Sequence, residues 1–189
     1  MTRQQYVEQY APMAQQVCKG TGIFPETLLA IAIIETQRKN SQGNYEPGAS
    51  TLARKANNHF AIKATKSWAG QTITLQTPKD ATPISKFRAY PTVRASFLDF
   101  IKFLQSNPRY TKAGVFRATT WQDQIVAIAR AGYAEGAGYA EKLHSIASKI
   151  QQYIKPTRTA ARYLLPLGIA TLTALALIYR QYERRKAAY

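Results

Sequence analysis

The sequence predicts a mainly helical α+β domain followed by one C-terminal transmembrane helix. Three observations lead to this prediction. Apolar residues recur at helical spacing through most of residues 1–154. Two short extended segments, which begin at Thr72 and Ile84, are separated by prolines and predict a small β-hairpin lobe. Near the C-terminus, residues 163–179 contain no charged side chain.

Start and stop signals place the helices in order along the chain. The first helical pattern covers residues 4–19 and ends at Gly20-Thr21-Gly22. Pro25, at a position typical of the first helical residue, begins a strongly apolar helix over residues 25–37. A polar loop is expected over residues 38–50. Three further helices are expected over residues 93–104, 120–131 and 137–153.

The uncharged segment 163–179 predicts a membrane anchor. As a helix, it would span about 25 Å, slightly less than a hydrocarbon core of about 30 Å. Tyrosines at both ends and flanking arginines supply interfacial anchors that compensate for this difference. A buried core helix is the alternative, but such helices seldom carry arginines at both ends. We therefore expect a domain over residues 1–154, a basic linker over 155–162, the transmembrane helix over 163–179 and a basic tail over 180–189.

Composition excludes several kinds of site. Cys18 is the only cysteine, which excludes an intramolecular disulfide framework and a cysteine-rich zinc site. His59 and His144 are the only histidines, which leaves little material for a metal centre or a histidine-based catalytic pair. We expect no cofactor. The net charge of +16 indicates an anionic partner, which could be a nucleic acid, an anionic lipid or a cell-wall polymer. No nucleic-acid-binding motif accompanies this charge, so nucleic acid is not the partner we expect.

A carboxyl group at the end of the apolar helix is the first catalytic candidate. Glu35 follows Ile31 by four residues and Leu28 by seven, so the three side chains fall within about 60° of one another on a helix. Desolvation and the negative end of the helix dipole both raise the pKa of such a carboxyl group. A carboxyl group that stays protonated near neutral pH can act as a general acid. The alternative is a solvent-exposed Glu35 that pairs with Arg38.

A series of short motifs follows this helix. The longest covers Leu52 to Lys63, with the sequence LARKANNHFAIK. The later ones are WAG at 68–70, FRAY at 87–90, SFLD at 96–99, NPRY at 107–110, AGYA at 131–134 and YAEKL at 139–143. In this order and spacing, the motifs resemble those of the glycoside hydrolase family 73 N-acetylglucosaminidases, which are peptidoglycan hydrolases of the lysozyme-like superfamily. The resemblance covers residues 6–153.

The resemblance implies a lysozyme-like domain and assigns roles residue by residue. Glu35 matches the catalytic glutamate, and Tyr133 matches a tyrosine near the scissile bond. Asn58 and Phe60 match residues that line the sugar groove. A structural role is the alternative for each of the last three residues: packing for Tyr133 and Phe60, and turn capping for Asn58. Two further candidates, which could stack on sugars or pack in the core, are Trp68 and Tyr90.

The chain departs from the family pattern at three places. The family's usual "ESGWG" is replaced by Glu35-Thr-Gln-Arg-Lys, and the glycine of "FGIK" is Ala61. The acid that relatives often carry after "W-x-G" is missing, and Asp80 is the nearest one. We therefore expect Asp80 to be the second catalytic carboxylate, with Glu46 as an alternative. If neither acts, the 2-acetamido group of the substrate or a water held by Tyr133 must supply the nucleophile.

The predicted function is cleavage of β-1,4 glycosidic bonds in peptidoglycan by a membrane-anchored N-acetylglucosaminidase. Its expected partners are the glycan strands and a lipid membrane. Muramidase and lytic transglycosylase variants are alternatives, as is a catalytically inactive peptidoglycan-binding or scaffold domain. The first residues show no apolar segment typical of a secretory signal. We therefore expect the protein in an internal membrane of a phage virion, or otherwise in the bacterial inner membrane with the enzyme domain facing the wall.

Overall fold

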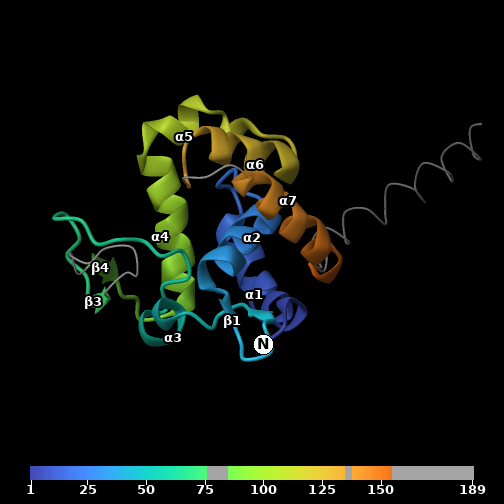
Figure 1. Cartoon of the computed structure of the whole chain (residues 1–189). Helices are drawn as coiled ribbons and strands as arrows, with labels where there is room; N and C mark the ends of the chain where they lie inside the picture. Colours follow the sequence, from blue (N-terminus) through green and yellow to red (C-terminus); the bar gives the residue numbers. More distant parts are fainter. Residues whose placement is uncertain (76–84, 135–137, 155–189) are drawn as a thin grey trace, which may run out of the picture. The chain divides into compact units, whose positions relative to one another are not determined.

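A helix with a wholly apolar middle, α2 (Pro25–Thr36), is the element around which the other helices are arranged (Figure 1). The structure is a computed structural model that describes residues 1–75, 85–134 and 138–154, all within one unit, Met1–Ile154. Pro25 begins the helix, and Glu26 lies in its first turn. Every residue from Leu28 to Ile33 is fully buried. Such a helix needs neighbours on all sides because it has no polar face to turn toward water.

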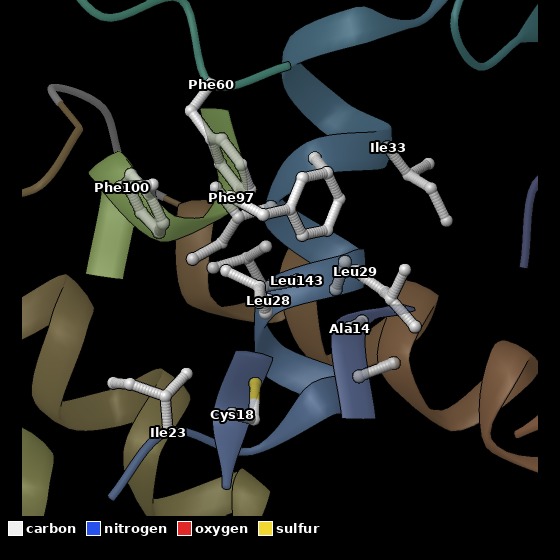
Figure 2. Close-up of a cluster of buried hydrophobic side chains, with 14 of the residues drawn as sticks. Ala14, Cys18, Ile23, Leu28, Leu29, Ile33, Phe60, Phe97, Phe100 and Leu143 are labelled. Atoms are coloured by element: carbon white, nitrogen blue, oxygen red, sulfur yellow. The ribbon is translucent and has the colours of Figure 1, made fainter. Parts of the chain in front are cut away.

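Three helices supply those neighbours. They are α1 (Arg3–Cys18), α6 (Trp121–Arg130) and α7 (Tyr139–Ile150). A fourth helix, α4 (Val93–Ser106), packs against α1 and brings Phe97 and Phe100 into the core beside Leu28 and Leu143 (Figure 2). Threonine side chains cap the first turns of α1, α4 and α6. Short elements complete the helical part: α3 (Thr51–Ala56), α5 (Pro108–Lys112), η1 (Val115–Arg117) and η2 (Gln151–Tyr153).

The five predicted helices are confirmed, with ends that differ by at most three residues. The prediction of a polar loop over residues 38–50 is corrected, because this segment contains an antiparallel pair of short strands, β1 (Arg38–Lys39) and β2 (Tyr45–Glu46). The Asn40 side chain causes this turn, since its Oδ1 accepts hydrogen bonds from the backbone N–H groups of Gln42 and Asn44. Such a turn leaves no alternating apolar pattern in the sequence.

The predicted β-hairpin lobe is confirmed. Strands β3 (Thr72–Leu75) and β4 (Ser85–Arg88) pair antiparallel, with Ile73 opposite Phe87. The chain after α3 extends this sheet, because the Ala64 N–H donates to Lys86 O at 2.9 Å and the Arg88 N–H donates to Ile62 O at 3.0 Å. Residues 62–64 therefore run along the outer edge of β4.

The predicted basic linker, transmembrane helix and basic tail, over residues 155–162, 163–179 and 180–189, lie outside the described residues. Within the described ranges, no helix combines the length and the apolar character needed to cross a membrane.

The backbone around Ala61 generates a stability prediction. Ala61 has φ of +51°, in the left-handed region that costs an L-residue about 1 kcal/mol or more. Ala61→Gly should therefore raise the free energy of unfolding by up to about 1 kcal/mol, measured by urea denaturation. Ala64→Gly is the matched control, because Ala64 does not have a positive φ. Glycine at this position only increases the entropy of the unfolded chain, so this substitution should lower the free energy of unfolding. Equal destabilisation by both substitutions would contradict the strain at Ala61.

Candidate active site

The site is built around the carboxyl group at the C-terminal end of α2. Glu35 lies in the last turn of this helix and is partly buried. Burial raises the pKa of the Glu35 carboxyl to about 7, and the nearby Arg38 guanidinium opposes part of this rise. Near neutral pH, Glu35 therefore keeps its proton to a much greater extent than an ordinary glutamate does.

The residue after Glu35 fixes its backbone. The buried Thr36 hydroxyl donates to Ala32 O at 2.6 Å and accepts from the Gly48 N–H at 3.0 Å, while Thr36 O accepts from the Ser50 N–H at 2.8 Å. These bonds tie the end of α2 to the segment that leads into α3. The helix end has little freedom to rotate, so the fold sets the position of the Glu35 backbone from which the side chain extends.

Buried polar side chains continue this network toward α3. The Tyr6 hydroxyl hydrogen-bonds to Thr36 and lies 2.6 Å from Nδ1 of His59. Burial lowers the pKa of His59 to about 4, so its ring is neutral at the pH at which Glu35 titrates. His59 therefore serves as an uncharged hydrogen-bond partner in the core and not as a proton donor to the substrate.

Glu35 lines a groove with a volume of about 340 Å³. Two of the predicted site residues, Phe60 and Tyr133, line it together with Glu35. Aromatic and aliphatic side chains dominate the lining, and they keep the dielectric constant around the carboxyl group low. The remaining lining residues are Ala61, Ile62, Lys63, Phe100 and Phe103.

Tyr133 lies in the groove, close to Glu35. Burial is the main cause that raises the pKa of Tyr133 well above 10, and the negative charge of Glu35 adds to it. Its ring meets Phe100 edge to face at 5.6 Å and lies 5.9 Å from the ring of Tyr139. The Tyr133 hydroxyl therefore stays protonated near neutral pH, and it can donate a hydrogen bond to a substrate or a water.

Asn58 lies beneath the groove and organises its floor. The side chain is 1% exposed, and its Nδ2 donates to Ile62 O and Arg88 O at 3.0 and 2.8 Å. Its Oδ1 accepts from the backbone N–H groups of Phe60 and Ile62. Because all of its hydrogen-bonding capacity is used inside the protein, Asn58 shapes the groove floor and does not face a sugar. Asn58 is not among the residues that line the groove, and its contacts fit the structural alternative considered for it, the capping of a turn.

Phe60 lines the groove although it is almost completely buried. It is 2% exposed and stacks face to face on Phe100, with 4.1 Å between ring centroids. Phe60 therefore forms part of the groove wall as well as part of the core, and the two roles considered for it coexist.

Trp68 and Tyr90 lie together in a different hollow, of about 450 Å³, between the hairpin lobe and α4. Their rings meet at 5.7 Å, and the Arg88 guanidinium lies 4.6 Å from the Trp68 ring. Asp99 Oδ2 accepts hydrogen bonds from both Arg88 Nη1 and the Tyr90 hydroxyl, each at 2.7 Å. Tyr90 is 7% exposed, so it mainly packs, whereas Trp68 keeps an accessible edge.

The two candidates for the second carboxylate have different positions. Asp80 lies outside the described residues. Glu46 is on β2, paired with Arg38, and its Oε1 accepts from Asn40 Nδ2 at 3.1 Å. Glu46 is not among the residues that line the groove at Glu35.

Several residues that line the groove were not predicted from the sequence, and neither was Tyr139, whose ring lies next to that of Tyr133. Phe100 and Phe103 are spaced by three residues on α4, which indicates one helix face but not that the face meets Glu35. Lys63 and Tyr139 stand within recognised motifs, and these motifs are the only signal that could have found them. The Tyr139 hydroxyl is buried and has no hydrogen-bond partner among the described residues, and its pKa is raised by burial and by the charge of Glu35.

This arrangement suits acid-assisted cleavage of a bond to oxygen. A partly buried carboxyl group with a pKa near 7 can give a proton to a poor alkoxide leaving group. A neutral tyrosine hydroxyl lies in the same groove, and aromatic rings form its walls.

Comparison with known proteins identifies the family. Residues 11–152 match the glucosaminidase family, described as mannosyl-glycoprotein endo-beta-N-acetylglucosaminidase. The peptidoglycan hydrolase FlgJ of Vibrio parahaemolyticus is 36% identical over 151 residues, which cover 77% of this chain and 47% of that protein. The exo-glucosaminidase LytG of Bacillus subtilis is 28% identical over 156 residues, covering 78% of this chain and 51% of that protein. The chain thus spans about half the length of these curated relatives.

Solved structures show the same fold. The glycoside hydrolase domain of Salmonella typhimurium FlgJ superposes with a TM-score of 0.61 at 27% identity, covering 92% of this chain and 99% of that one. The catalytic domain of the autolysin Auto from Listeria monocytogenes gives a TM-score of 0.63 at 26% identity, with 81% and 88% covered. The match to the family model spans most of the chain, and it includes Glu35 and the groove residues around it. The chain therefore belongs to the glucosaminidase family and is a glycoside hydrolase.

Proposed function

We propose that this glycoside hydrolase cleaves β-1,4 bonds in the glycan strands of peptidoglycan, as an N-acetylglucosaminidase. The observation that supports this most directly is Glu35, a carboxyl group with a raised pKa in an aromatic groove. FlgJ of Vibrio parahaemolyticus, a peptidoglycan hydrolase, supports the choice of substrate. The net charge of +16 also fits a wall whose peptide stems carry carboxylates.

In this mechanism, Glu35 gives its proton to the glycosidic oxygen as the bond breaks. The positive charge that develops on the sugar ring needs a stabilising group on the opposite side. Asp80 is the carboxylate we propose for this role, with the 2-acetamido group of the substrate or a water held by Tyr133 as the alternatives. Tyr133 supports the last of these because its neutral hydroxyl lies in the groove with Glu35.

The bond that is cut distinguishes three related activities. Among the relatives are an exo-glucosaminidase and a probable N-acetylmuramidase, at 28% and 29% identity, so similarity at this level does not select one of them. Fragments with a reducing-end N-acetylglucosamine would identify the glucosaminidase that we propose. Reducing-end N-acetylmuramic acid would identify a muramidase, and an anhydro-muramic end would identify a lytic transglycosylase.

The role of Glu35 can be tested with one substitution. Glu35→Gln in the full chain keeps the shape of the side chain but removes the transferable proton, so wall clearing should fall about 10²–10⁴-fold. Mass spectrometry should detect fragments with reducing-end N-acetylglucosamine from the parent but not from the variant. Glu26→Gln is the control, because it makes the same change at the other end of α2. Glu35→Gln activity within threefold of the parent would disprove the role as general acid.

The same substitution should increase stability above neutral pH. The pKa of Glu35 is 4.5 in the unfolded chain and about 7 in the folded one. Between these values the folded state binds more protons, so this group reduces stability as pH rises, by at most about 3 kcal/mol. Glu35→Gln removes this loss. The difference in unfolding free energy between variant and parent, from urea denaturation, should therefore be small at pH 4 and largest at pH 8. A pH-independent difference would contradict the raised pKa.

We also propose that residues 163–179 anchor the enzyme in a membrane. The support is in the sequence, an uncharged segment with tyrosines at both ends and arginines beyond them. An internal membrane of a phage virion, or the bacterial inner membrane with the enzyme facing the wall, would bring the groove to its substrate.

Membrane attachment can be separated from simple charge attraction. Full-length protein should stay with lipid vesicles during high-salt and carbonate washes, because hydrophobic insertion is not screened by salt. A chain truncated after Tyr153 should not sediment with vesicles. Release of the full-length protein by these washes would show that the basic residues bind headgroups and that the segment does not insert.

A further inference from the structure

A second cleft lies in the same unit as the groove and shares no residue with it. It has a volume of about 610 Å³ and is formed by the start of α1, the turn between β1 and β2, and the end of α7 with η2. We call it the α1–α7 cleft. No step of the proposed mechanism uses it.

Aromatic and amide side chains give this cleft the character of a carbohydrate site. Tyr45 is 51% exposed, an unusual degree for a large ring, and Tyr153 lines the cleft with it. Asn44 and Gln152 are exposed and supply amide donors and acceptors beside these rings. Sugars need both kinds of contact, because a pyranose has apolar C–H faces and a rim of hydroxyl groups.

The charge of the cleft is positive. Arg3 and Lys149 line it, and Lys39 Nζ lies 5.4 Å from the centre of the Tyr45 ring. None of the described residues that line the cleft is acidic. Glu8 and Glu46, on the neighbouring segments, are not among the lining residues, and each accepts a hydrogen bond from a side-chain amide, at 2.9 Å from Gln4 and at 3.1 Å from Asn40. The charge of the described lining is therefore positive, which favours an anionic ligand.

The β1–β2 hairpin connects the cleft to the catalytic groove. Arg38 is close enough to Glu35 to lower its pKa, and Arg38 pairs across the hairpin with Glu46, the neighbour of Tyr45. One hairpin thus begins beside the general acid and ends at the cleft. A glycan strand held at the cleft would be kept near the groove, which raises its effective concentration there.

We infer that the α1–α7 cleft is a second binding site for peptidoglycan, in which Tyr45 stacks on a sugar ring while Arg3 and Lys149 bind the carboxylates of the peptide stems. This inference rests on the proposed function for the class of ligand. The described residues that line the cleft include no carboxyl group, so its role in this inference is binding: it keeps the enzyme on the polymer between cleavage events.

The test measures binding without turnover. The full chain with Glu35→Gln is sedimented with insoluble purified peptidoglycan, either intact or freed of its peptide stems by an amidase. Arg3→Gln/Lys149→Gln should weaken binding to the intact wall about tenfold at low salt. The loss should be much smaller on the stripped glycan. Tyr45→Ala should weaken binding to both substrates about fivefold or more.

Matched controls separate the cleft from general charge. Arg94→Gln/Lys142→Gln removes the same two charges from exposed positions, with Lys142 on the same helix as Lys149, and neither residue lines the cleft or the groove. Binding of either cleft variant within twofold of the parent would overturn the inference. An equal loss in the control would overturn it as well. Failure of the proposed function has a separate signature, because the chain with Glu35 intact would then release no glycan fragments, whatever the cleft binds.

Discussion

The site depends on one constraint: a carboxyl group ends a helix that has no polar face. Because the middle of α2 is apolar on all sides, α1, α6 and α7 pack around it. Glu35, in the last turn of this helix, therefore lies at the boundary of the core. The burial that stabilises the helix is thus also what raises the pKa of Glu35. The catalytic property and the packing of the core have the same origin. The carboxyl group is chemically useful because the fold does not solvate it fully.

A second set of interactions holds the end of α2 and the floor of the groove in place. Thr36 holds the end of α2 to the following segment, and Tyr6 and His59 extend the network toward the groove floor. Asn58 then fixes the floor itself with four hydrogen bonds. These residues touch no substrate in the mechanism proposed here. Their contribution is that Glu35 and Tyr133 face one groove without having to be ordered when a substrate arrives.

The sequence predicted those features that depend on local pattern. Pro25 and the apolar run after it were sufficient for α2, and the AGYA motif was sufficient to place Tyr133 beside Glu35. The separate hollow of Trp68 and Tyr90 was not predictable in this way. It is determined by Asp99, which binds Arg88 and Tyr90 from another element, and such a contact forms only in the folded chain. The β1–β2 turn was missed for a related reason, because a single side chain, Asn40, closes it.

The edge pairing of residues 62–64 with β4 connects the hairpin lobe to the floor of the groove. Ile62 and Lys63 line the groove, yet their backbone belongs to the sheet of the hairpin lobe. The lobe and the groove floor therefore share one hydrogen-bonded backbone, which Asp99 ties to α4 through Arg88 and Tyr90. Glu35 belongs to a different part of the fold, because α2 is held at its end by Thr36. The catalytic acid and the groove floor are thus positioned by separate sets of contacts, so a substitution in one set need not displace the other.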